Sequence, residues 1–144
     1  MDRPRSSRQH VAPATTFVQR LPSSMKDPRP QSPIFVKTYN FLLWIIPLTL
    51  KFPKSQRFLL AERLSSMGLD FYDLILDAVM EPNLQSEHLD QADKLLTKIR
   101  LYVRLSHDLQ CISPKQFEHA ARLMDELGRL LGGWKRKLAS TKKQ

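Results

Sequence analysis

The chain has 144 residues, of which 42% are hydrophobic, and a formal net charge of +9. The length suits one domain, and the apolar share excludes a wholly disordered protein. Only four glycines occur, among many Leu, Ala, Lys, Arg, Glu and Gln residues, which favours helix over sheet.

Positive charge is concentrated at the two ends of the chain. Residues 1–32 hold six basic and two acidic side chains, residues 129–144 hold six basic and no acidic ones, and the middle is nearly balanced. Cationic ends of this kind attract polyanions, nucleic acid before an anionic membrane. Solubility alone is the competing explanation of the same charge.

The sequence favours a cytoplasmic protein without a membrane segment. Cys111 is the only cysteine, so no internal disulfide forms and a reducing compartment is the simplest expectation. No apolar stretch follows the basic N-terminus as it does in a secretory signal. The longest apolar run, 41–50, is half of the roughly 20 residues that span a bilayer.

The first predicted segment, 1–32, is a disordered basic tail, because five prolines lie among polar residues without apolar periodicity. It is an arm that binds RNA or DNA, a dispensable extension, or the product of a misassigned start codon. A four-helix bundle is predicted over 33–138, and a second basic tail over 139–144.

The first helix is expected to begin at Pro33, with Ser32 as its N-cap, to kink at Pro47 and to end before Pro53. Its remaining sides are also apolar, so we expect a second subunit to cover part of it. The predicted core face is Ile34, Thr38, Phe41, Leu42, Ile45 and Leu48.

The second helix is predicted over 54–79. Gly68 near its centre either permits close approach of another helix or marks a bend. The apolar stripe consists of Phe58, Ala61, Leu64, Met67 or Gly68, Phe71, Ile75 and Ala78.

The third and fourth helices are predicted over 86–109 and 114–137. Ser113 and Gln116 have the spacing of a capping box at the start of the fourth. The third helix has the core face Leu89, Ala92, Leu96, Ile99 and Val103, and the fourth has the seam Phe117, Ala120 or Ala121, Met124, Leu127, Leu131, Trp134 and Leu138. Short connections predict an all-α, antiparallel up-down-up-down four-helix bundle.

The sequence contains few signs of catalytic chemistry. It has no glycine-rich phosphate loop and no Glu-x-x-His pair of the kind that binds metals in helix bundles. Cys111 lacks the signature of a nucleophile and is expected to lie in the turn between the last two helices. We therefore predict a protein that is not an enzyme and needs no metal or cofactor, with a bundle metalloprotein as the disfavoured alternative.

Basic side chains are the candidate site residues. Lys94 and Lys98, like Arg100 and Arg104, are spaced i, i+4, so each pair lies along one face of the third helix and suits successive phosphates. The spacing suits a solvated face paired with nearby aspartates equally well. The fourth helix adds Lys135, Arg136 and Lys137 next to Trp134, whose seam position favours core packing over base stacking.

Several segments resemble a known family. Residues 52–60 are similar to the second-helix start of small four-helix bundles, which include proteins encoded in ribosomal RNA intervening sequences and the accessory variability determinant (Avd) of diversity-generating retroelements. Residues 95–105, 112–117 and 126–134 resemble the Avd pattern, and the match covers 34–138.

The Avd resemblance implies a barrel-like homopentamer that associates with the retroelement's reverse transcriptase and with template RNA or cDNA, for mutagenic cDNA synthesis. It also implies that the family's basic pair maps onto Arg100 and Arg104. The segment 1–32 departs from the family core. The alternative is a stand-alone interaction bundle like the intervening-sequence proteins, and an adjacent reverse-transcriptase gene would discriminate between the two.

Overall fold

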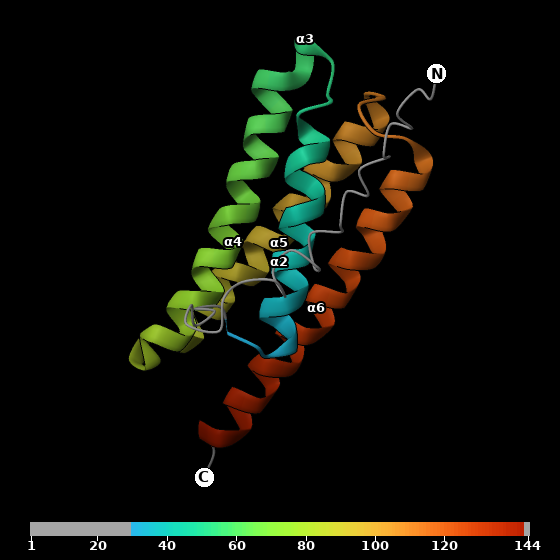
Figure 1. Cartoon of the computed structure of the whole chain (residues 1–144). Coiled ribbons are helices and arrows are strands. Elements are labelled where there is room, and N and C mark those ends of the chain that lie inside the picture. The colour runs from blue at the N-terminus through green and yellow to red at the C-terminus, as the bar shows by residue number, and fades with distance from the viewer. Residues whose placement is uncertain (1–29, 143–144) are drawn as a thin grey trace, which may run out of the picture.

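A computed structural model describes residues 30–142, which form an antiparallel four-helix bundle (Figure 1). The long helices are α2 (Pro33–Thr49), α4 (Glu62–Met80), α5 (Gln85–Asp108) and α6 (Pro114–Lys142). Each contacts the next along the chain, and α6 also contacts α2, so the four close into a ring. The predicted up-down-up-down fold is confirmed. All of the predicted tail 1–32 except its last three residues lies outside the described residues.

The core faces of α2 and α5 are confirmed at every predicted position. In α2 all six predicted residues are buried, and in α5 the predicted residues are each at most 1% exposed. The 3.6-residue period alone predicts these positions, because both helices keep a regular phase from end to end. In α6, Ala120, Met124, Leu127 and Leu131 are buried as predicted.

The predicted helix 54–79 is in fact three segments: α3 (Lys54–Gln56), the π-helical turn η1 (Arg57–Ala61) and α4. A π turn takes more residues than an α turn, which changes the phase of the side chains that precede α4. The predicted apolar stripe is therefore wrong at its first residue, Phe58. Phe58 is 82% exposed, whereas Leu60 and Ala61 are buried.

Gly68 of α4 is a site of close helix approach. It is buried, and a Cβ at this position would lie 2.9 Å from Cδ2 of Leu42 on α2. Nearby, the Thr49 hydroxyl of α2 lies 3.0 Å from the Ser65 hydroxyl of α4. These contacts join α2 to α4. Helix α2 itself continues through Pro47 and ends at Thr49.

Local hydrogen bonds close the turn between α5 and α6. Gln110 has a left-handed φ of 62°, its N–H donates to the His107 carbonyl at 2.9 Å, and the Cys111 N–H donates to the Ser106 carbonyl at 2.8 Å. This is the Schellman pattern of a helix C-terminus. Cys111 lies in this turn as predicted, and partial burial raises the pKa of its thiol.

The capping box that begins α6 is confirmed. The Gln116 N–H donates to the Ser113 hydroxyl at 3.1 Å, and the Ser113 N–H donates to Oε1 of Gln116 at 2.8 Å. The helix then continues to Lys142, past the predicted end near Lys137. Lys, Leu and Ala in this stretch are good helix formers, and no proline interrupts them.

Candidate nucleic-acid interface

Arg100 extends from α5 onto the backbone of α6. Its Nη2 donates to the Met124 carbonyl at 3.1 Å and lies 3.9 Å from Oδ1 of Asp125. The guanidinium rests over Gly128, where a Cβ would lie 2.5 Å from Nη2. Its side chain is still 42% exposed, so part of its five-donor fork faces solvent.

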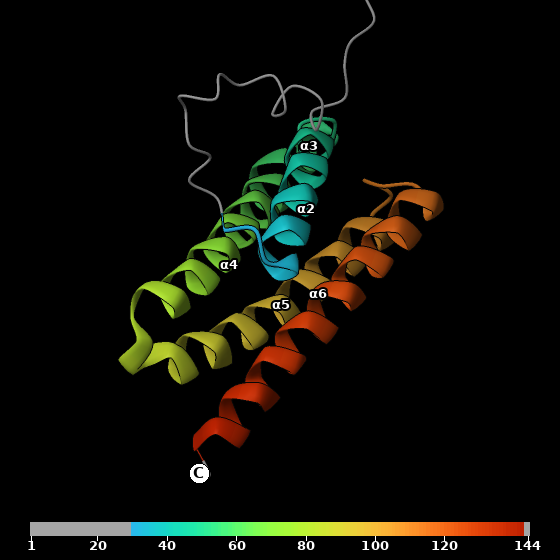
Figure 2. The same cartoon turned by 60° about the horizontal axis from the view of Figure 1, so that its bottom comes forward.

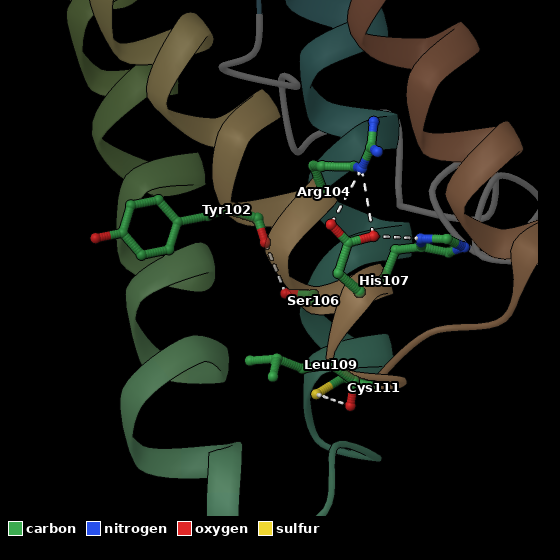
Figure 3. Close-up of polar contacts among 7 residues, drawn as sticks. Tyr102, Arg104, Ser106, His107, Leu109 and Cys111 are labelled. Carbon is green, nitrogen blue, oxygen red and sulfur yellow. Dashed lines mark hydrogen bonds and ion pairs between the residues drawn. The ribbon is translucent and has the colours of Figure 1, made fainter.

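Arg104 is held within α5 instead. Its Nε donates to the two carboxylate oxygens of Asp108 at 3.3 and 3.2 Å, and Nδ1 of His107 lies 3.1 Å from Oδ1 (Figure 3). The hydrogen bond with His107 is the main cause that lowers the pKa of Asp108, with a further contribution from Arg104. The predicted arginine pair is thus one helical turn apart in sequence, but its two members have different partners.

Lys94 and Lys98 are exposed on α5, and neither has an ion pair within residues 30–142. At about 100° per residue, Lys98 and Arg100 lie about 160° apart around the helix. The lysine pair and the arginine pair therefore occupy different faces of α5 and do not form one continuous cationic strip.

Lys135 joins α6 to α5. Its Nζ lies 3.0 Å from Oδ1 of Asp90 and 3.1 Å from Oδ2 of Asp93. These two hydrogen bonds raise the pKa of Lys135. Because two carboxylates already neutralise this lysine, it offers less to an external phosphate than its sequence position predicts.

Arg136 and Lys137 are exposed on α6, and Arg136 shares an open pocket with Arg100. Arg129 lines the same pocket, and it is absent from the site predicted by sequence. The signal was present, since Arg129 and Arg136 are seven residues apart, two turns of helix on nearly the same face.

Trp134 packs against the bundle, as its seam position predicts. Its ring meets that of Phe35 on α2 edge to face, with centroids 6.0 Å apart. It is partly buried against the hydrophobic core. The indole is therefore engaged by the chain's own residues and is not displayed for base stacking.

Within residues 30–142, no three His, Cys, Asp or Glu side chains are grouped as metal ligands would be. None of the helices in this range combines the length and the apolar character needed to cross a bilayer. The remaining candidates are the basic side chains of α5 and α6. These two helices lie side by side (Figure 2).

The fold and these side chains define a small four-helix bundle with basic groups concentrated on its last two helices. The chain matches the family described as bAvd-like over residues 34–138, and it belongs to that family. The match includes Arg100, Arg104, Gly128 and all four long helices except the first residue of α2 and the end of α6. No curated protein matches the chain significantly.

Proposed function

We propose that this chain is a non-catalytic accessory protein of a diversity-generating retroelement. In this role it binds template RNA or cDNA and the reverse transcriptase, and it supports mutagenic cDNA synthesis. The observation that carries the proposal is the bAvd-like match over 34–138. The exposed cations of α5 and α6 support it, because they provide the charge that a phosphate backbone requires.

The proposed contact residues differ in whether their charge is already paired with a carboxylate of the chain. Lys94, Lys98, Arg136 and Lys137 have exposed side chains with no ion pair within residues 30–142. Arg100 retains free donors, whereas Arg104 and Lys135 must share their charge with aspartates. We expect the first group and Arg100 to provide most of the affinity.

The double variant Arg100→Gln/Arg104→Gln tests the nucleic-acid part of this proposal. For single strands, log K falls with log salt with a slope of about −0.7 for each neutralised phosphate. The variant should therefore bind single-stranded RNA more weakly and with a shallower salt slope, measured by fluorescence anisotropy across a salt series. Its circular dichroism should remain helical.

Lys54→Gln/Arg122→Gln is the matched control, because it removes the same charge from exposed positions elsewhere. Equal binding by wild type and the Arg100/Arg104 variant at every salt concentration would contradict the assignment. Co-purification with the neighbouring gene products tests the reverse-transcriptase part separately.

We further propose a homopentamer, as the family resemblance implies. Three exposed apolar residues, Val36 and Leu43 of α2 and its C-cap residue Leu50, are spaced seven residues apart and so form one stripe. The only charged residue of α2 is Lys37, which lies 3.4 Å from Glu126 of α6. An uncharged apolar stripe of this kind suits burial against another copy.

A further inference from the structure

Three arginines converge on an open pocket between α5 and α6. Arg100 reaches it from α5, and Arg129 and Arg136 reach it from α6; Asp93, Asp125 and Gly128 complete the lining. Side chains on a helix lean toward its N-terminus, so Arg136 extends back toward Arg129. A Cβ at Gly132 would accordingly lie 3.4 Å from Nη1 of Arg136.

The charges in this pocket are not balanced. Asp93 is engaged by Lys135 at 3.1 Å, and Asp125 is 3.9 Å from Arg100 with a side chain that is 70% exposed. Within residues 30–142, Arg129 and Arg136 have no ion pair. Three guanidiniums therefore line the pocket with two carboxylates, one of which also pairs with Lys135. A hollow in which one sign of charge is in excess concentrates the opposite charge.

Gly128 decides where one of these guanidiniums lies. A Cβ at this position would be 2.5 Å from Nη2 of Arg100, closer than any real contact, and 3.6 Å from Cζ. A side chain at this position would displace the Arg100 guanidinium, the far end of a flexible side chain, from the place where it donates to the Met124 carbonyl. The fork is thereby oriented before any ligand arrives, which reduces the cost of binding.

We propose that this pocket binds a phosphodiester group of single-stranded nucleic acid, with Gly128 as the residue that positions Arg100. Phosphate oxygens accept from guanidiniums that approach from several directions, whereas a planar carboxylate is matched by a single bidentate fork. The proposal deepens the nucleic-acid role proposed above and rests on it. It assigns contacts to Arg129 and a positioning role to Gly128.

Gly128→Ala tests the positioning role, because it changes no charge and introduces a better helix former. Affinity for a fluorescein-labelled 20-nucleotide RNA should fall about tenfold, the loss of one charge-assisted contact. Gly133→Ala is the matched control, because its added Cβ would lie 3.9 Å from the nearest atom, an ordinary contact. It should bind like wild type.

Arg129→Gln and Arg136→Gln test the pocket without touching the α5–α6 packing, and each should also weaken RNA binding about tenfold. Arg122→Gln, on α6 outside the pocket lining, should not. Single-stranded DNA of the same sequence should show equal losses, since a phosphodiester contact does not involve the 2′-hydroxyl. A loss confined to RNA would overturn the phosphodiester assignment.

The two proposals fail differently. If Arg100→Gln/Arg104→Gln weakens RNA binding but Gly128→Ala, Arg129→Gln and Arg136→Gln do not, the pocket proposal is wrong and the nucleic-acid role stands. If wild type binds neither RNA nor DNA, both are wrong. If the pocket variants instead lose only co-purification with the reverse transcriptase, the pocket binds protein and the phosphodiester proposal is overturned.

Discussion

Asp108 limits how many hydrogen-bond donors of Arg104 are available to an external phosphate. Its carboxylate accepts from Arg104 and also lies against His107, so one acid at the end of α5 engages two bases. The carboxylate would also repel an approaching phosphate. The sequence predicts the Arg104–Asp108 spacing but not the outcome, because an i, i+4 pair forms only where no other partner competes.

We expect Asp108→Asn to strengthen RNA binding modestly, because it frees the donors of Arg104 and removes a negative charge beside them. Lowering the pH until Asp108 is protonated should also strengthen RNA binding, because protonation removes the same negative charge. Since the folded-state pKa of Asp108 lies below 3.8, its contribution to stability is present above pH 3.8 and is lost as pH falls through the lowered value. Anisotropy titrations of both proteins at neutral pH measure the effect, and unchanged or weaker binding by the variant would contradict it.

Arg100 shows why the site could be predicted only in part. Spacing along α5 places its Cα correctly, but the direction of its guanidinium depends on α6 and on the missing side chain at Gly128. Contacts between helices depend on the relative register of two segments that are far apart in sequence. Periodicity in one helix carries no information about that register. The seven-residue spacing of Arg129 and Arg136 indicates a shared face of α6, but it does not indicate that this face lies beside Arg100.

Among the elements, regular helices were predicted well and irregular ones were not. The core positions of α2 and α5 follow from a constant period, and the start of α6 follows from its capping box. The π turn η1 has no comparable signature, because an extra residue in a turn is accommodated by packing. Phe58 was assigned to the core for that reason.

The end of α5 carries a strained residue in a favourable motif. Gln110 occupies the left-handed position of the Schellman turn, where an L side chain costs about 1–2 kcal/mol. Gln110→Gly should remove this strain, but glycine also loses more conformational entropy on folding. The net expected effect is a rise of about 1 kcal/mol or less in the free energy of unfolding.

Urea denaturation followed by circular dichroism measures the change in Gln110→Gly. Gln91→Gly, at an exposed position inside α5, is the control and should destabilise the chain by about 1 kcal/mol. A lower midpoint for Gln110→Gly would show that the turn is not under strain.

For the whole molecule, the single chain already covers most of the apolar surface of α2. Phe35 is buried, and Trp44 and Ile46 pack against the core, although the sequence predicted that a neighbouring copy would cover such residues. Burial by α4 and α6 could not be separated from burial by another subunit, since both require the same apolar side chains. The stripe with Leu43 at its centre is the part that remains uncovered.

Leu43→Glu should dissociate the proposed pentamer, because the stripe would then have to bury an unpaired charge. Leu43 is 40% exposed in the single chain, so the helical fold should survive. Native mass spectrometry reads out the mass, and Leu101→Glu, 65% exposed on α5, is the control. Dissociation by Leu101→Glu alone would move the interface to α5.

The contact between the Arg100 guanidinium and Gly128 also fixes the register of α5 against α6. Asp93 lies seven residues before Arg100, and Lys135 lies seven residues after Gly128, so a single antiparallel register satisfies both contacts. A shift by one turn, about 5.4 Å, would break both at once. A force that a bound strand exerts on Arg100 would therefore be shared by α5 and α6 through both contacts.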